Sequence, residues 1–556
     1  MDLQDPTPRS ARATRGHAGV YLAFIFLTGA VTLALELLAS RVMTPYFGVS
    51  LYIWTGILSI TLVALSLGYY LGGRLTGTGA SERVGRLEFH FLLMPALSSL
   101  AISVSCLAYP ITFSALAGFS LVVGSLVACM VLLFAPLVAV SAMNPLLIAI
   151  QRFSGSSTEQ MGDSGSGLVF FTSTVGSVIG VFVTAFVFIP NFTNFNSIVF
   201  LAIVLAAISL LGTLRPGAIQ PGQRRSLRVA GSAALAVGVA ILSFSSTYLK
   251  KEESIAFGGN LWTIEREYTS LFGNTKIIAI RPPGQDRNVV RVMTNDGLTM
   301  NTVDAWGRSL SPFTYALEYM AVGLRPDAAK VLVLGLGAGV VPMRMAARGA
   351  EVDVVEINPD YLDAAVDYFD FDPTKARVIE TDARTFVRDC REEYDVVVLD
   401  LFQGDGVPDY LLTREFFADV AGCMGPSGVA VFNTLAAVGH LDVYYDVVKT
   451  VRAELPALLM FHEEVRTDRV ELNVYLAAAR TELVWDFELP REKLPPAMAE
   501  NLRRVFARPR PLDAALLERA TVIRDESNTF AFTNGPADIV HRRSTLQSLP
   551  AEFRTN

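Results

Sequence analysis

Seven long apolar runs in the first half of the chain constrain its fold more than any other feature of the sequence. A helix needs about 20 apolar residues to cross the hydrocarbon core of a bilayer. The runs occupy positions 20–38, 52–71, 89–109, 121–140, 168–189, 198–214 and 229–246. They predict a multi-pass α-helical membrane domain over residues 19–249 that follows a cytoplasmic tail at residues 1–18, with the lipid bilayer as a partner.

Charged residues are distributed unevenly along the chain. They make up 18% of its 556 residues, below the roughly 25% of ordinary soluble proteins. The deficit lies before Ser246, whereas the composition from Lys250 onward resembles that of a soluble domain. The chain therefore combines a membrane half with a soluble half.

Net charge and cysteine spacing argue against other classes of protein. A net charge of −7 argues against a nucleic-acid-binding surface. The cysteines are widely spaced and match no disulfide framework or metal-ligand motif; they are Cys106, Cys129, Cys390 and Cys423. We therefore expect no nucleic-acid partner, no disulfide and no metal.

Polar and small residues within the apolar runs predict how the spans are arranged. Glu36 is costly in lipid, so it should face protein or water and find a partner such as Arg41; the alternatives are a structural ion pair and a polar substrate site. Glycines four residues apart predict close helix contacts at Gly68 and Gly72 and at Gly176 and Gly180. The short segment 141–150 contains a proline and is expected to be a re-entrant or interfacial extension.

From residue 331 the pattern changes to strands that alternate with helices. Apolar strands are expected at 331–334, 351–356, 377–380, 395–400 and 429–434, and this pattern indicates a parallel sheet covered on both faces. Two further strands, 458–463 and 470–477, should close the sheet in antiparallel orientation. The sequence thus predicts an α/β Rossmann-like domain of the class I methyltransferase type over residues 326–556. A small β element with strands at 262–268, 275–280 and 289–293 is expected within residues 250–325.

The turn after the first of these strands contains three glycines, Gly335, Gly337 and Gly339. Glycines at this position let the backbone approach a ligand, and an acid at the end of the second strand, here Glu356, can accept hydrogen bonds from ribose hydroxyls. Val341 stands where the dinucleotide fingerprint has its third glycine. The turn therefore indicates a nucleotide-type ligand, and a dinucleotide and an adenosyl cofactor are the alternatives.

Two more acids follow strands of the same sheet. Asp382 and Ala383 come directly after the third strand, where an acid can bond to an adenine amino group. Asp400 follows the fourth strand and points toward the crevice in which such sheets bind their ligands. This layout favours an adenosyl sulfonium over a nicotinamide.

The chain resembles the membrane-anchored spermidine synthases, or polyamine aminopropyltransferases, over nearly its whole length. In the membrane half the resemblance rests on LELLASRVMTPYFG, LYIWTGI and LGYYLGGRL. In the soluble half it rests on NDG, VLVLGLGAG, VVEINP, TDAR, and VVLDLF followed by PDYLLTREFF. Together these motifs are quite specific to the family.

The resemblance implies transfer of an aminopropyl group from decarboxylated S-adenosylmethionine to an amine such as putrescine, in polyamine and spermidine biosynthesis. By position, Glu356 would bind ribose, Asp382 and Ala383 would bind adenine, and Asp400 would be the catalytic carboxylate. Because a primary amine is protonated at neutral pH, with a pKa near 10.4, a carboxylate can attract it and take its proton. The resemblance also implies association into a homodimer through the soluble domain.

The chain departs from soluble spermidine synthases at positions that contact the amine. Ala338 replaces an aspartate in the glycine turn, Gln403 replaces an aspartate after the catalytic one, and Met300 replaces a glutamine. The family's Tyr-His/Gln-Glu motif is here Tyr315-Ala316-Leu317, of which Tyr315 remains as a substrate candidate. Further substrate candidates in the loop after Asp400 are Gln403, Asp405 and Asp409.

Two other functions compete with aminopropyl transfer. A methyltransferase would use intact S-adenosylmethionine, whose carboxylate an alanine at position 338 would not repel. A membrane transporter or sensor would bind an adenosyl metabolite without turnover, and Glu36 supports that hypothesis. The identity of the product separates the two enzymes.

The arginines of the membrane half conflict with the expected compartment. With seven spans they fall on one side; they are Arg9, Arg12, Arg15, Arg74, Arg83, Arg86, Arg215, Arg224, Arg225 and Arg228. The positive-inside rule assigns that side to the cytoplasm, and an odd number of spans then places the soluble half outside. We expect a multi-pass cell-membrane protein whose soluble half is cytoplasmic, because the cofactor is made in the cytosol. This expectation disagrees with the orientation that the arginines favour.

Overall fold

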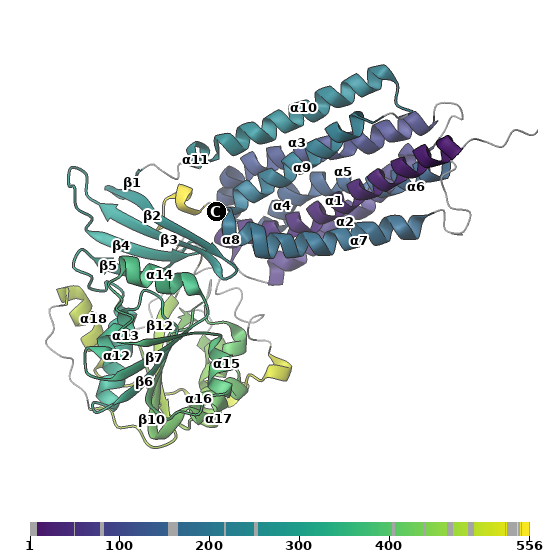
Figure 1. Ribbon diagram of the computed structural model, residues 1–556. Helices are drawn as coiled ribbons and strands as arrows, with labels where there is room; N and C mark the ends of the chain where they lie inside the picture. The colour runs from purple at the N-terminus through teal and green to yellow at the C-terminus, as the bar shows by residue number, and fades with distance from the viewer. Residues whose placement is uncertain are drawn as a thin grey trace, which may run out of the picture. The chain divides into compact units, whose positions relative to one another are not determined.

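The computed structural model of the chain forms two compact units (Figure 1). The helical unit covers Met1–Phe47 and Leu51–Glu252, and the α/β unit covers Glu253–Arg554. All residues are described except 1–7, 49–50, 78–82, 120, 154–164, 216–217, 250–253, 403–405, 439–440, 464–470, 487–493, 529, 531–541, 543–544, 546–547 and 555–556.

The described part of the helical unit has seven helices long and apolar enough to cross a membrane, one for each expected run. Its helices are α1 (Pro8–Phe47), α2 (Leu51–Leu75), α3 (Arg83–Leu116), α4 (Leu121–Cys129), α5 (Ala135–Ser141), α6 (Met143–Phe153), α7 (Ser166–Val183), α8 (Ile189–Asn191), α9 (Asn194–Thr213), α10 (Pro221–Ser243) and α11 (Ser245–Tyr248). The segment expected as a re-entrant extension instead prolongs the fourth apolar helix, which runs over Val122–Phe153.

The glycine pairs lie where helices meet. A Cβ atom at Gly176 would lie 2.0 Å from the carbonyl oxygen of Phe26, and one at Gly180 would lie 2.2 Å from that of Ala30. Gly68 and Gly72 pack equally closely against the segment around Ser141. Because no side chain fits at these positions, the expected close helix contacts are confirmed.

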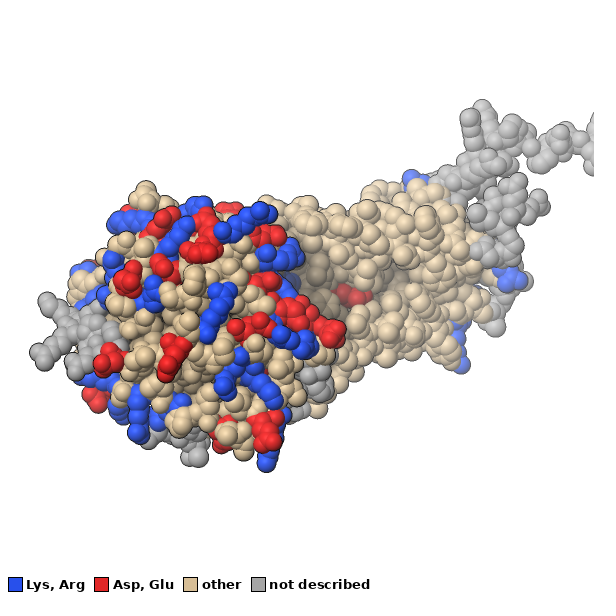
Figure 2. All heavy atoms as spheres, turned by 90° about the horizontal axis from the view of Figure 1, so that it is seen from below, with Lys and Arg blue, Asp and Glu red and all other residues tan. Residues whose placement is uncertain are grey.

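The surface of the helical unit differs from that of a soluble protein. The face visible in Figure 2 carries almost no charged side chain, and basic residues gather at one end. Many large apolar side chains are exposed, among them Leu62, Val104 and Phe186. Glu36 is buried, and its Oε1 atom has no hydrogen-bond partner among the described residues. Such a surface is typical of a lipid-facing bundle.

The α/β unit begins with a five-stranded antiparallel sheet in the order β1-β2-β3-β4-β5. Its strands are β1 (Ile255–Phe257), β2 (Asn260–Ser270), β3 (Gly273–Arg281), β4 (Val290–Asn295) and β5 (Leu298–Asp304). Three of these strands were expected from the sequence, while β1 and β5 extend the sheet at its two edges. The β4–β5 turn reaches the candidate site described below.

The second sheet has seven strands in the order β11-β12-β10-β9-β6-β7-β8. These are β6 (Lys330–Leu334), β7 (Glu351–Glu356), β8 (Arg377–Glu380), β9 (Tyr394–Leu399), β10 (Met424–Ala437), β11 (Ala457–His462) and β12 (Glu471–Ala479). Strands β8, β7, β6, β9 and β10 are parallel, whereas β12 is antiparallel to both of its neighbours. The Rossmann-like expectation is confirmed, and the order reverses between β6 and β9, where such sheets bind ligands.

Helices cover both faces of the seven-stranded sheet (Figure 1). Alternate residues of β6 face opposite sides: Val331 and Val333 belong to one core, Leu332 and Leu334 to the other. The first core packs under α12 (Pro312–Leu324), α13 (Val340–Ala346), α14 (Pro359–Tyr368) and α18 (Pro496–Phe506). The second packs under α15 (Ala383–Arg388), α16 (Arg414–Gly422), α17 (Leu441–Glu454) and α19 (Ala514–Arg519). Burial on both faces explains why the strands are continuously apolar.

The expectation that no cysteines pair is wrong for Cys390 and Cys423. They are joined as a disulfide with Cα atoms 5.7 Å apart, within the range of about 4.4–6.8 Å that a disulfide spans. Cys390 follows α15 and Cys423 follows α16, and these two helices pack against each other. Packing of the two helices brings together residues whose spacing in sequence shows no pattern.

Candidate active site

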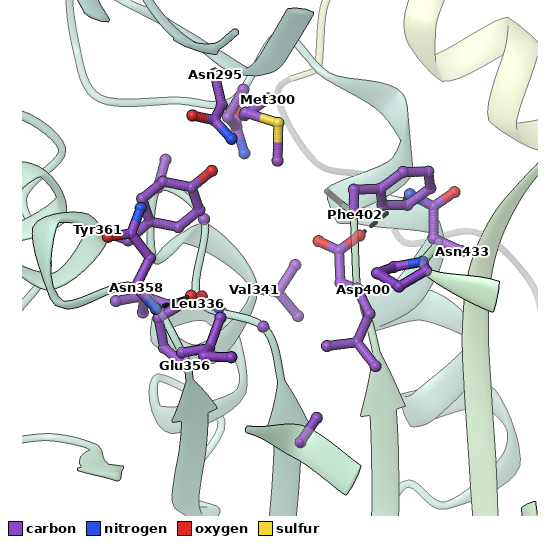
Figure 3. A pocket seen from close by; sticks show the side chains of 18 of the residues that line it. Asn295, Met300, Leu336, Val341, Glu356, Asn358, Tyr361, Asp400, Phe402 and Asn433 are labelled. Atoms are coloured by element: carbon purple, nitrogen blue, oxygen red, sulfur yellow. Dashed lines mark hydrogen bonds between the residues drawn. The ribbon is translucent and has the colours of Figure 1, made fainter. Parts of the chain in front are cut away.

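The carboxyl ends of the parallel strands border a cavity of about 270 Å³ (Figure 3). One side is lined by the glycine turn after β6 and by the ends of β7 and β8. The other side is lined by residues that follow β9, by β10 and β12, and by the β4–β5 turn. All of these elements belong to the α/β unit, so the site lies entirely within it.

Two glycines of the turn are required by close contacts. Gly335 has φ +97°, and a Cβ atom there would lie 2.3 Å from the carbonyl oxygen of Asp400. At Gly339, with φ +72°, a Cβ atom would meet the Phe371 ring at 2.5 Å. Gly337 has φ +51° and open space around its Cβ position. Gly335 and Gly337 line the cavity, whereas Gly339 serves packing at the start of α13.

Glu356 joins the end of β7 to the glycine turn. Its Oε2 atom accepts a hydrogen bond from the Leu336 N–H at 2.9 Å, and its Oε1 atom accepts one from the Asn358 N–H at 2.8 Å. Burial raises the pKa of Glu356, and these backbone donors oppose that rise. The carboxylate is therefore fixed at the edge of the cavity, in the place predicted for a ribose-binding acid.

Asp382 follows β8 and caps α15. Its Oδ2 atom accepts from the Thr385 N–H at 2.9 Å, and its Oδ1 atom accepts from the hydroxyl of Tyr410 at 2.8 Å. Burial raises the pKa of Tyr410, helped by the hydrogen bond to Asp382, so the phenol stays a donor. Ala383 is buried beside Asp382 at the same wall. Sequence reasoning missed Tyr410, although it lies within the PDYLLTREFF motif.

Asp400 lies directly after β9, on the side of the cavity that faces Glu356 (Figure 3). Its backbone N–H donates to the Leu334 carbonyl at 3.0 Å, which fixes it beside the glycine turn. The Asn433 side chain donates from Nδ2 to Oδ1 of Asp400 at 3.2 Å. Burial raises the pKa of Asp400 to about 6, and the bond from Asn433 opposes the rise. Because this pKa lies about one unit below neutral pH, Asp400 is mostly ionised there.

The wall around Asp400 is mostly neutral. It is lined by amides and apolar side chains, namely Asn295, Leu298, Met300, Asn301, Phe402, Asn433 and Asn473. Among the described lining residues the acids are Glu356, Asp382 and Asp400. Met300, which replaces the family's glutamine, lines the cavity (Figure 3). The amides of β10 and β12 carry no sequence motif, so sequence reasoning did not find them.

Tyr315 and Asp409, two further predicted substrate residues, do not line this cavity. The Tyr315 hydroxyl donates to the Ser309 carbonyl at 3.0 Å, and its ring lies under the Arg344 guanidinium, outside this cavity. Asp409 is not among the lining residues, and its carboxylate accepts from the Tyr410 N–H at 3.0 Å. Gln403 and Asp405 lie outside the described residues.

The cofactor side of the cavity fits an adenosyl group. The open space at Gly337 allows a ligand to approach the backbone closely. The Glu356 carboxylate is held where ribose hydroxyls can donate to it, and Asp382 is held where an adenine amino group can donate. Gly335, Gly337, Glu356, Asp382 and Ala383 would hold this group.

Residues 313–467 match the family described as spermine/spermidine synthase domain. The match begins in α12 and covers β6 to β11, and thus most of the cavity walls. Most of the residues that line the cavity therefore lie in the region that is similar to this family.

The chain is similar to curated and solved members of this and related classes. It is 37% identical over 117 residues to the polyamine aminopropyltransferase of Vibrio vulnificus, covering 20% of this chain and 39% of that protein. It is 30% identical over 168 residues to the N-terminal histidine N-methyltransferase of Emericella nidulans, covering 28% and 29%. The chain spans less than half the length of both. A probable spermidine synthase of Corynebacterium glutamicum aligns in structure at 18% identity and TM-score 0.38, over 48% of this chain and 98% of that one.

Proposed function

We propose that this protein is a polyamine aminopropyltransferase that moves an aminopropyl group from decarboxylated S-adenosylmethionine to an amine such as putrescine. One observation carries the proposal: the Asp400 carboxylate shares one cavity with the adenosyl-binding residues, and its backbone contacts the Gly335 turn. The family match of residues 313–467 supports the same reaction class.

In this mechanism Asp400 attracts the protonated amine and takes a proton from it, which frees the nitrogen lone pair. The nitrogen then forms a bond to the aminopropyl carbon while the carbon–sulfur bond breaks. The sulfonium becomes the neutral thioether of methylthioadenosine, so charge and atoms balance. Glu356 and Asp382 hold the adenosine, and this positioning supplies much of the acceleration.

The surroundings of Asp400 suit this role. Its pKa of about 6 leaves it ionised at neutral pH, yet makes it a stronger base than an exposed aspartate. The apolar side chains of Phe402 and Met300 line the same cavity. A partly dry site strengthens the attraction between the carboxylate and a cationic amine.

A second candidate is methyl transfer from intact S-adenosylmethionine. Ala338 lines the cavity in the glycine turn, where an aspartate would repel the carboxylate that distinguishes this cofactor. The similarity to an N-methyltransferase is consistent with this alternative.

The reaction products decide between these functions. Purified full-length protein is mixed with either cofactor and a panel of amines, and products are read by mass spectrometry with Asp400→Asn as control. We expect methylthioadenosine and an aminopropylated amine, both absent with the variant. Adenosylhomocysteine and a methylated amine would move the assignment to methyl transfer. Cofactor binding without any product would favour a sensor or transporter.

We also propose that the helical unit spans the cell membrane and that the α/β unit is cytoplasmic, where the cofactor is made. Alkaline phosphatase fused after residue 556 tests this, because the enzyme is active only outside the cytoplasm. We expect an inactive fusion. An active one would establish the orientation that the arginines favour.

A further inference from the structure

Arg384 joins three parts of the α/β unit beside the candidate site. It lies on α15, two residues after Asp382. A guanidinium carries several donors in one rigid plane and can serve two acceptors at once. The Nη1 atom of Arg384 donates to the Tyr410 carbonyl at 2.8 Å, and its Nη2 atom donates to the Asp525 carboxylate. The start of α15 therefore contacts Tyr410 twice, because Arg384 binds its backbone and Asp382 accepts from its hydroxyl.

The aspartate partner lies in a C-terminal segment, residues 523–528, outside the region similar to the family, which ends at residue 467. Ile523 anchors this segment, because its side chain is buried in the core that packs under α16 and α17. At the other end of the segment, the Asn528 side chain donates from Nδ2 to the Asp409 carbonyl at 2.9 Å. The C-terminal segment therefore contacts the short 3₁₀ helix that carries Tyr410 from the side opposite the core.

This 3₁₀ helix, η3 (Asp409–Leu411), has few bonds of its own. Backbone bonds from Leu411 and Leu412 close its turn, and such turns have poorer hydrogen-bond geometry than α-helices. Contacts from outside therefore decide where Tyr410 lies. Because a hydroxyl bonds to an oxygen only within about 2.5–3.0 Å, a small displacement of η3 would separate the Tyr410 hydroxyl from Asp382.

The ion pair between Arg384 and Asp525 has a local effect. The bond from Arg384 lowers the pKa of Asp525, so this aspartate is an anion at neutral pH. The two side chains are 22% and 43% exposed, and exposed ion pairs contribute little to the free energy of unfolding. Removal of the pair should therefore change the position of η3 more than the stability of the fold.

We infer that Arg384 is a positioning residue for the adenosyl ligand. It holds Tyr410 by its backbone, the Tyr410 hydroxyl then keeps the Asp382 carboxylate oriented at the cavity, and Asp525 fixes the guanidinium. The inference rests on the proposed function for the class of ligand, an adenosyl compound. It makes cofactor affinity depend on the C-terminal segment, which lies outside the region similar to the family.

The variant Arg384→Met tests this role, because methionine keeps an unbranched side chain but has no donor. Arg388→Met is the matched control, since Arg388 ends the same helix and pairs with Asp389 at 3.7 Å on the surface. Methylthioadenosine is titrated calorimetrically into the full-length protein, and turnover of decarboxylated S-adenosylmethionine with putrescine gives KM and kcat. Tyr410→Phe, alone and combined with Arg384→Met, completes a double-mutant cycle.

We expect Arg384→Met to weaken methylthioadenosine binding about fivefold. The KM for decarboxylated S-adenosylmethionine should rise by a similar factor, while kcat stays within about twofold because uniform binding is lost and the base is unchanged. In the Tyr410→Phe background the same substitution should have almost no further effect, because the bond through which it acts is already absent. Asp525→Asn should weaken binding about twofold, since a neutral amide holds the guanidinium less firmly. Arg388→Met should bind like the wild type.

The outcomes separate this inference from the proposed function. If the wild-type protein turns over putrescine and Arg384→Met keeps its affinity, the inference is wrong while the function stands. Equal losses of affinity from Arg384→Met with and without Tyr410→Phe, together with a lower melting temperature, would show a merely structural role and also refute it. If the wild-type protein neither binds methylthioadenosine nor produces it, both the function and the inference are overturned.

Discussion

The two walls of the cavity are built on different principles. On the wall formed by the glycine turn, Glu356 and Asp382, here called the cofactor wall, main-chain atoms supply most of the contacts. Backbone N–H groups hold both carboxylates, a turn with positive φ angles provides the close approach, and the Tyr410 hydroxyl adds one side-chain bond to Asp382. On the wall formed by Asp400 and the amides of β10 and β12, here called the acceptor wall, the backbone of Asp400 is fixed by its bond to Leu334, but its carboxylate is held by the Asn433 side chain. Under the proposed function, cofactor binding would therefore depend mainly on backbone geometry, and acceptor choice would depend on side chains that single substitutions can change.

The largest expected effect lies on the acceptor wall, at the base. Asp400→Asn should lower kcat about a thousandfold, because general-base catalysis contributes roughly 10²–10⁴-fold. Methylthioadenosine affinity should stay within about twofold, since the cofactor wall is unchanged. Steady-state kinetics and calorimetry measure the two quantities. A large loss of cofactor affinity would mean that the walls are not separable.

The next largest effect is a loss of stability at the contact between Gly335 and Asp400, where the two walls meet. Gly335→Ala should destabilise the fold by about 2–4 kcal/mol, because its Cβ atom would overlap the Asp400 carbonyl and φ is +97°. Gly337→Ala is the matched control: its Cβ has open space, so the cost should be only about 1 kcal/mol. Thermal unfolding in detergent compares the stability of the two variants. Equal losses of stability would show that the contact between position 335 and Asp400 is not the cause.

A smaller effect concerns stability and pH. Burial raises the pKa of Asp400 to about 6 in the folded protein, above the ordinary value of about 3.9. Ionisation is therefore harder in the folded state, and stability is lost as pH rises from about 4 through 6. Asp400→Asn should be more stable than wild type by about 1–2 kcal/mol at pH 8 and indistinguishable near pH 4. Melting curves at the two pH values check the sign; a variant less stable at pH 8 would contradict it.

The smallest effect lies on the cofactor wall. Tyr410→Phe removes the hydroxyl that bonds to Asp382, so methylthioadenosine affinity should fall about threefold to tenfold. Tyr315→Phe is the control, because the hydroxyl of Tyr315 bonds to Ser309 outside the cavity. Calorimetric titration of both variants measures the difference, and equal affinities would show that Tyr410 does not position Asp382.

The difference between backbone placement and side-chain contacts also explains which site residues the sequence predicts. Gly335 and Asp400 directly follow β6 and β9, Glu356 ends β7, and Asp382 lies two residues after β8. Because the parallel topology brings these strand ends to one edge, a pattern in the sequence locates them. Asn433 lies within β10, one residue beyond the last pair of that strand with β9. Its contact with Asp400 depends on the geometry of its amide, which no sequence spacing encodes.

Other misses have related causes. Tyr410 bonds to Asp382 from a short 3₁₀ helix 28 residues later in the chain. The periodicity of helices and strands gives no signal for a contact between such distant side chains. Tyr315 was a substrate candidate by position, but its helix α12 turns the side chain into the core. Strands β1 and β5 were missed because β1 has three residues and β5 alternates irregularly between buried and exposed positions.

The contact between Gly335 and Asp400 also has a consequence for evolution. Pairing of β6 with β9 sets the spacing between the adenosyl cradle and the base, so loops and outer strands can change without altering it. Substitutions on β10, β12 and the β4–β5 turn could then exchange one nucleophile for another in small viable steps. A single domain can by this route give rise to enzymes that act on different acceptors.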